Sequence, residues 1–126
     1  MLAASLSHRD LGRYIGDGLK DPERVFVLGL IDDYPVGLAA ATCERVGEGT
    51  RPVATVELIF VEPNARGVGV AESMISLVHD WAEARGCTGI DAPALPGNRA
   101  AKAFFEGQGF LARLLVMHHP LRGGDA

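Results

Sequence analysis

The chain has 126 residues, of which 48% are hydrophobic and 22% charged, with a formal net charge of −4. This length suits one compact domain with its own core. The acidic balance argues against a general nucleic-acid-binding protein, which needs a broad basic face to neutralise phosphates. The N-terminal segment lacks the basic region of a secretion signal, and no apolar run is long enough to span a bilayer. Cys43 and Cys87 form neither a disulfide framework nor a paired metal-ligand spacing, so we expect a cytoplasmic protein without a metal site.

The first half of the chain predicts one helix and three strands. Ser7 and Asp10 have the spacing of a capping box, and apolar residues follow at helical spacing, so we expect a helix within residues 1–22. Two runs rich in β-formers, residues 24–31 and 36–46, flank a turn-forming segment and predict a hairpin. A third strand is predicted over residues 53–61, since the following Pro63 cannot donate to a ladder.

The second half alternates helices and strands. Apolar residues recur with a period of 3.6 from Val70, and this helix ends near Gly86. A short strand over residues 87–92, a helix capped by Asn98 and a last strand over residues 110–119 follow. Residues 121–126 are predicted to be a flexible tail. The order indicates a single α/β domain over residues 1–126 with a mixed sheet, an antiparallel meander followed by βαβαβ.

The loop between the third strand and the long helix carries the clearest chemical signal. The small residues Gly67, Gly69 and Ala71 leave backbone N–H groups unshielded at the N-terminus of that helix, where an anion is favoured. Arg66 adds a fixed charge able to contact phosphate. No Gly-Lys-Ser/Thr follows, and the third glycine of a dinucleotide fingerprint would fall on Glu72, so P-loop and NAD sites are excluded. The alternative is a tight strand-to-helix turn without a ligand.

Two motifs resemble those of a known family. The first resembles motif A of the GNAT superfamily of acyl-CoA-dependent N-acetyltransferases, whose pattern is Arg/Gln-x-x-Gly-x-Gly/Ala; it reads Val61-x-Pro63-x-x-Arg66-Gly67-x-Gly69-x-Ala71. The second resembles motif B and reads Asn98-x-x-Ala101-x-x-Phe104-Phe105-x-x-x-Gly109-Phe110. The resemblance covers roughly residues 24–120 and implies a GNAT-like fold with acetyl-CoA as cosubstrate and no metal.

The resemblance also implies individual cofactor contacts. Backbone groups of Val61 would pair with the pantetheine arm where the third strand splays from the strand after Cys87. The amides around Gly67, Val68, Gly69, Val70 and Ala71, with Arg66, would take the pyrophosphate. Asn98 would hydrogen-bond the pantetheine arm, while Phe104 and Phe105 would pack near its thiol end. Asn98 is equally suited to cap its helix.

Acetyl transfer to an amine needs a base, a donor for the developing oxyanion and a proton for the leaving thiolate. Glu57 resembles the strand carboxylate that many family members use as the base; the alternative is a solvated strand carboxylate. The family's usual general acid is a tyrosine, and Phe105 stands at that position. Water, or one of His118, His119 and Cys87, would then supply the proton, or the protein binds CoA without turnover.

The N-terminus is shorter than in most family members, which have a strand and a first helix before the hairpin. We therefore expect an acceptor site completed by a second subunit, in a homodimer. The predicted activity is acetylation of a small-molecule or peptide amine; a non-catalytic CoA-binding module and transfer to an alcohol are alternatives. Several acidic residues suggest a cationic acceptor: Asp32, Asp33, Glu44, Glu48 and Glu57. No nucleic-acid or membrane partner is expected.

Overall fold

A four-stranded sheet with the order β1-β2-β3-β4 forms the centre of the protein in the computed structural model, which describes residues 8–44, 49–94 and 99–123. The strands are β1 (Arg24–Ile31), β2 (Tyr34–Glu44), β3 (Val53–Val61) and β4 (Ile90–Asp91). The first three pair antiparallel, and β4 pairs parallel with β3. The helices are α1 (His8–Gly18), α2 (Val70–Ala84) and α3 (Arg99–Gly107). The predicted class, a mixed α/β sheet, is confirmed.

The β1–β2 hairpin closes through a two-residue turn. Asp32 and Asp33 both have positive φ, 49° and 66°. This is the backbone of a type I′ turn, whose twist matches that of the two strands it joins, and aspartate tolerates it better than most residues. β2 therefore begins at Tyr34 rather than at residue 36, and Pro35 lies beside a register shift, where a missing N–H is tolerated.

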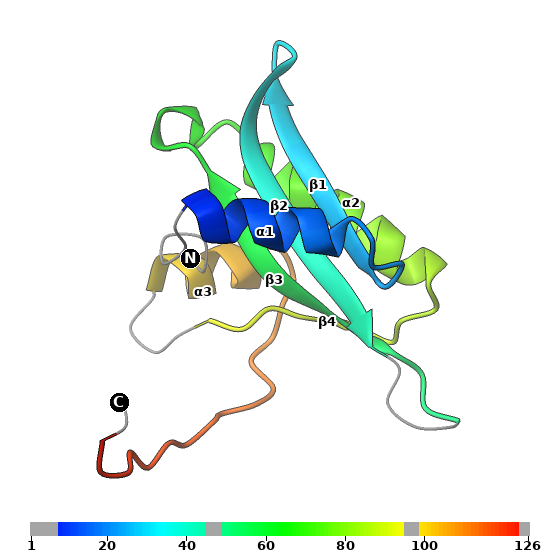
Figure 1. Cartoon of the computed structure of the whole chain (residues 1–126), viewed down its shortest axis with the longest axis vertical. Helices are drawn as coiled ribbons and strands as arrows, with labels where there is room; N and C mark the ends of the chain where they lie inside the picture. Colours follow the sequence, from blue (N-terminus) through cyan, green and yellow to red (C-terminus); the bar gives the residue numbers. More distant parts are fainter. Residues whose placement is uncertain (1–7, 45–48, 95–98, 124–126) are drawn as a thin grey trace.

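Helices α1 and α2 cover opposite faces of the sheet (Figure 1). Met74 and Val78 of α2 are among the most deeply buried side chains, and they pack on the inward side chains of β1, β2 and β3. Gly29 and Gly37 are opposite one another in the β1–β2 register. A Cβ on Gly29 would overlap Cγ1 of Val70, and a Cβ on Gly37 would lie 3.1 Å from Cε of Met74. This pair of glycines lets α2 approach the sheet closely.

The last part of the chain differs from the prediction. The strand expected over residues 87–92 is reduced to Ile90–Asp91, and the strand expected over residues 110–119 is absent, although the structure describes all of residues 99–123. We call residues 111–121 the C-terminal arm, which extends away from the sheet (Figure 1). Its six large apolar side chains are 75–88% exposed: Leu111, Leu114, Leu115, Val116, Met117 and Leu121. The prediction was wrong because apolar composition cannot show whether a strand finds a partner.

Among the described residues, no helix combines the length and the apolar character needed to cross a bilayer.

Candidate active site

The loop that joins β3 to α2 presents backbone donors at the start of the helix. We call residues 66–71 the cradle loop; it follows a short 3₁₀ turn, η2 (Pro63–Ala65). Gly67 and Gly69 have φ of 86° and 89°, in the left-handed region that favours glycine. Gly69 is the N-cap of α2 and supplies no side-chain cap, so the first-turn N–H groups of α2 keep their capacity to donate. The loop therefore directs donors and the positive end of the helix dipole outward.

The space above the cradle loop is open. A Cβ built on Gly67 or Gly69 would meet no heavy atom within 4 Å. Val68 is exposed, whereas Val70 is buried in the core and Ala71 packs against it, so these two residues offer only their backbone on the solvent side. Open space, uncapped donors and a helix N-terminus together suit a pyrophosphate group. The residues present thus fit the phosphates of a CoA cosubstrate.

Arg66 reaches back to the strand that precedes it. Its Nε donates a 3.0 Å hydrogen bond to the carbonyl oxygen of Val61. This contact ties Arg66 to the end of β3, and the carbonyl of Val61, whose backbone groups we predicted to contact the pantetheine arm, already accepts one hydrogen bond. A carbonyl oxygen has a second lone pair, so this contact leaves room for a further donor. Arg66 itself is exposed at the edge of the cradle loop.

Strands β3 and β4 separate soon after they pair. Their parallel register consists of Ala54 with Ile90 and Thr55 with Asp91, after which β3 continues to Val61 without β4 beside it. The splay expected between these strands is therefore present. Between this point and the cradle loop, β4 does not pair with the edge of β3. An extended ligand can pair with the backbone of a strand at such an edge.

Glu57 lies in a β-bulge of β3. Ala40 is opposite Leu58 and Ala41 is opposite Val56, so Glu57 is the extra residue between them. If side chains alternated strictly along β3, residue 57 would lie on the same face as the core residue Ile59, which is the face that packs against α2. Val56 takes that place instead, and the bulge directs Glu57 towards α1 on the other face.

The Glu57 carboxylate accepts hydrogen bonds from two other elements. Nε of Arg24, at the start of β1, donates to Oε1 over 2.9 Å, and the hydroxyl of Tyr14 in α1 donates to the same oxygen over 3.1 Å. Nη2 of Arg24 donates a longer bond of 3.4 Å to Oε2. Arg24 also lies over the Tyr14 ring, 5.1 Å from its centroid. The side chain of Glu57 keeps 31% of its surface exposed, so solvent reaches the carboxylate.

The contact of Tyr14 with Glu57 is a feature that the sequence did not reveal. Partial burial, together with the negative charge of Glu57 and the hydrogen bond to it, raises the pKa of Tyr14 from 10.0 to about 12. The phenol therefore keeps its proton throughout the neutral range. Only a pairing of a helix with a strand 43 positions away brings these two groups together, and a sequence pattern carries no signal for it.

The motif B residues Phe104 and Phe105 lie on α3, and Phe110 follows the helix. Phe105 is 7% exposed and belongs to the core cluster, with its ring centroid 5.2 Å from those of Phe104 and Phe110. Phe104 is partly buried against the same cluster. The role predicted for these two side chains near the thiol stays a prediction. Asn98 lies outside the described residues.

The alternative proton donors lie apart from Glu57 in the fold. Cys87 follows the C-terminal end of α2, whereas the cradle loop lies at its N-terminal end. His118 and His119 belong to the exposed C-terminal arm, where Nδ1 of His119 contacts the carbonyl oxygen of Pro120 at 3.0 Å. The structure brings none of the three into contact with Glu57 among the residues it describes.

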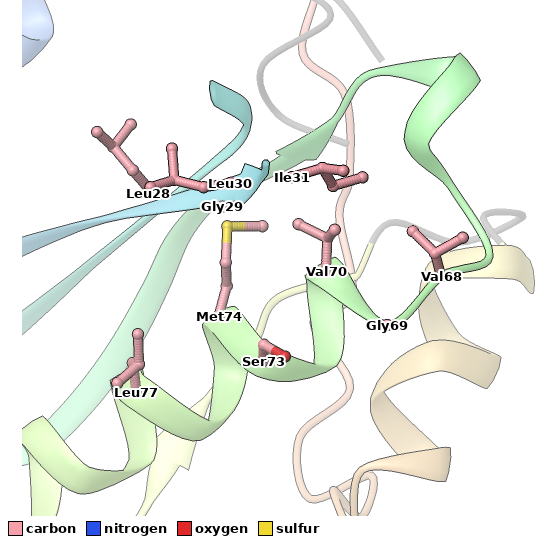
Figure 2. A pocket seen from close by; sticks show the side chains of 10 residues that line it. All are labelled: Leu28, Gly29, Leu30, Ile31, Val68, Gly69, Val70, Ser73, Met74 and Leu77. Atoms are coloured by element: carbon pink, nitrogen blue, oxygen red, sulfur yellow. The ribbon is translucent and has the colours of Figure 1, made fainter. Parts of the chain in front are cut away.

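A groove of about 220 Å³ lies next to the cradle loop, between β1 and the first turns of α2 (Figure 2). Gly69 and Val68 form one end of it, and Leu77 lies towards the other. Its remaining lining is mostly aliphatic: Leu28, Gly29, Leu30, Ile31, Val70, Ser73 and Met74. The groove has no charged side chain in its lining, in contrast to the Glu57 cluster on the other face of the sheet.

The uncapped N-terminus of α2 beside a splayed sheet is an arrangement that suits a phosphate-bearing ligand. The family model described as the acetyltransferase (GNAT) family matches residues 4–110. The chain belongs to this family, as the two motifs indicated.

Curated relatives and solved structures agree with this assignment. An uncharacterized N-acetyltransferase of Methanocaldococcus jannaschii is 29% identical over 99 residues, 78% of this chain and 44% of that protein. The aminoglycoside N(6')-acetyltransferase type 1 of Salmonella typhimurium is 29% identical over 86 residues, 66% of this chain and 59% of that protein. The chain thus spans about half the length of these relatives. The aminoglycoside N-acetyltransferase AAC(6')-Iy, solved in complex with CoA, superposes with a TM-score of 0.75 at 26% identity, covering 97% of this chain and 96% of that chain.

Proposed function

We propose that the protein is an N-acetyltransferase that moves an acetyl group from acetyl-CoA to a primary amine by direct attack on the thioester. The observation that carries this proposal is the cradle loop, whose glycines Gly67 and Gly69 leave open space above uncapped donors of α2. Membership of the acetyltransferase family and the likeness to a CoA-bound structure support the same conclusion.

The cradle loop is proposed to hold the pyrophosphate of acetyl-CoA. Backbone N–H groups from Gly67 to Ala71 donate to the phosphate oxygens, and the dipole of α2 favours their negative charge. Arg66 closes the loop on Val61 and adds positive charge at its rim. The unpaired edge of β3 then receives the pantetheine arm. From Val61 back to Glu57 the strand covers about 13 Å, which separates the phosphate site from the reacting end.

Acetyl-CoA supplies the acetyl thioester that the amine attacks. Glu57 is proposed to take the proton of the attacking ammonium group, directly or through a water molecule. Its Oε1 already accepts two bonds, from Tyr14 and Arg24, whereas Oε2 accepts the longer one. Oε2 is therefore the atom assigned to the proton. Tyr14 and Arg24 are positioning residues that hold the carboxylate.

The leaving thiolate is proposed to take its proton from water. A thiol has a pKa of about 8.5, so its anion leaves without a strong acid beside it. This assignment accommodates Phe105, which has no proton to give. The phenol of Tyr14 has no role at the thiolate in this proposal, because its hydroxyl donates to Glu57.

The proposed acceptor is a cationic amine, with aminoglycosides the first class to test. Two features support this choice: several matched relatives carry the name aminoglycoside N(6')-acetyltransferase, and Asp32 and Asp33 form an acidic turn at the end of the hairpin. A polyamine or a lysine side chain has the same chemistry and belongs in the same panel. A cytoplasmic location stays a prediction from composition.

We also propose a homodimer, supported by the C-terminal arm. A run of large exposed apolar residues is typical of a surface that binds another protein. Near the start of the arm, Nε of Arg113 donates a 2.8 Å hydrogen bond to Oδ1 of Asp91 in β4, and this hydrogen bond lowers the pKa of Asp91. A second copy supplies a partner for the arm and a wall for the acceptor site. Light scattering at tens of micromolar protein checks this; a monomer contradicts it.

The experiment that tests the activity is calorimetric titration of acetyl-CoA into the protein, followed by a thiol-release assay over a panel of aminoglycosides, polyamines and peptide amines. Binding with amine-dependent release supports the proposal. Binding without release from any amine supports the alternative, a non-catalytic CoA-binding module. Absence of binding contradicts the cofactor assignment itself.

A further inference from the structure

Two cysteine side chains from distant parts of the sequence meet at the end of the sheet far from the cradle loop. Cys43 lies near the end of β2, and Cys87 lies in the turn between α2 and β4. Their sulfur atoms are 3.1 Å apart, although 44 positions separate the residues. A disulfide bond of about 2.05 Å therefore needs an approach of roughly 1 Å.

The backbone holds both cysteines in this position. The N–H of Cys43 donates to the carbonyl oxygen of Glu23 over 2.8 Å, and the N–H of Cys87 donates to that of Ala82 over 3.0 Å. Thr88 donates in turn to the carbonyl oxygen of Pro52 over 2.9 Å, which ties the turn to the start of β3. Backbone hydrogen bonds of β2 and of the turn after α2 thus position the two side chains.

The two sulfurs differ in access. Cys43 is 2% exposed and belongs to the buried residues, whereas Cys87 is partly exposed. Attack on an external disulfide requires a thiolate that the reagent can reach. Cys87 is therefore the residue that reacts first, and Cys43 is the residue that resolves the adduct.

We propose that Cys43 and Cys87 form a redox-modification site that a low-molecular-weight disulfide oxidises to an intramolecular disulfide. The Cys87 thiolate attacks one sulfur of the reagent, forming a mixed disulfide and releasing one small thiolate. The Cys43 thiolate then attacks the Cys87 sulfur and releases the second. Two protein thiols lose two electrons and two protons, and the reagent is reduced to two thiols.

The new bond would join β2 to the turn that leads into β4. That turn pairs with β3 through the hydrogen bond from Ala54 N–H to the carbonyl oxygen of Gly89, so the crosslink spans both neighbours of β3. Closing a long loop restricts the unfolded chain. The oxidised protein should melt roughly 5 to 15 °C above the reduced one. Because the site lies at the other end of α2 from the cradle loop, acetyl-CoA affinity should not change.

The test is incubation of the full chain with oxidised glutathione, followed by mass spectrometry of the intact protein and thermal melting. We expect a monomeric product that has lost two hydrogens, retains no glutathione and melts higher, with reversal by a dithiol reductant. A disulfide-linked dimer, or a wild-type protein that keeps glutathione, overturns the proposal.

Two single variants test the order of attack. Cys43→Ser should accumulate the glutathione adduct on Cys87, because no resolving thiol remains. Cys87→Ser should react at least tenfold more slowly, because Cys43 is buried. Equal reaction rates for the two variants contradict the assigned roles. Failure of this site leaves the acetyltransferase proposal untouched, since acetyl-CoA titration of the same preparation reads the cradle loop separately.

Discussion

The hydroxyl of Tyr14 in α1 donates a hydrogen bond of 3.1 Å to Oε1 of Glu57 in the bulge of β3. Arg24 donates to the same oxygen from the start of β1. Two elements, α1 and β1, thus donate to one carboxylate of β3 at the face of the sheet opposite α2. A solvated strand glutamate would have no such partners, so this arrangement favours a defined role for Glu57.

Tyr14 provides a pH-dependent test of this cluster. Its pKa is raised to about 12, whereas an unfolded tyrosine ionises near 10. The folded state therefore holds a proton that the unfolded state has lost, and the free energy of unfolding should fall as pH rises from about 10 to about 12. Absorbance of tyrosinate during alkaline titration should show one late transition that Tyr14→Phe removes. Tyr34→Phe, which replaces the other tyrosine, should leave that transition in place.

Replacement of Glu57 tests the proposed base. Glu57→Gln keeps the size of the side chain but cannot take a proton, so kcat should fall by about a hundredfold while the Kd of acetyl-CoA stays the same. Glu62→Gln is the matched control, since Glu62 follows the same strand and is exposed. An unaltered pH–rate profile in Glu57→Gln would exclude Glu57 from proton transfer.

Replacement of Gly69 tests the cradle loop. Gly69→Glu places a carboxylate where the phosphates are proposed to bind and removes several charge-assisted hydrogen bonds, so affinity for CoA should fall by roughly a hundredfold or more. Gly86→Glu is the matched control because Gly86 also has positive φ, 76°, and open space around it, but lies past the other end of α2. Calorimetric titration measures the CoA affinity of both variants. Retained CoA affinity in Gly69→Glu contradicts the cradle assignment.

Gly29 tests the close packing of α2 on the sheet. Gly29→Ala adds a methyl group that overlaps Val70, so the free energy of unfolding should fall by about 1–3 kcal/mol. Gly12→Ala should raise the free energy of unfolding, because a Cβ on Gly12 in α1 would meet no heavy atom within 4 Å and alanine favours the helix. Urea denaturation compares the two variants. Equal stability of Gly29→Ala and the wild type would mean that α2 can move away at little cost.

The sequence by itself determined the features that depend on neighbouring residues. The period of apolar residues predicted α2, and the glycines before it predicted a loop with outward donors, since positive φ and an uncapped helix start are local properties. The hairpin and β3 were predicted for the same reason, with boundaries within a few residues. The family motifs added the fold class and the cosubstrate.

Only the tertiary structure decided the features that need two distant segments. The bulge at Glu57 exists because β2 pairs with β3 on both sides of it, and the contacts of Glu57 with Tyr14 and Arg24 follow from that bulge. The meeting of Cys43 and Cys87 depends on the packing of α2 and the β2–β3 pairing. The C-terminal arm has the composition of a strand, yet a strand needs a partner for its backbone hydrogen bonds, and composition does not specify that partner.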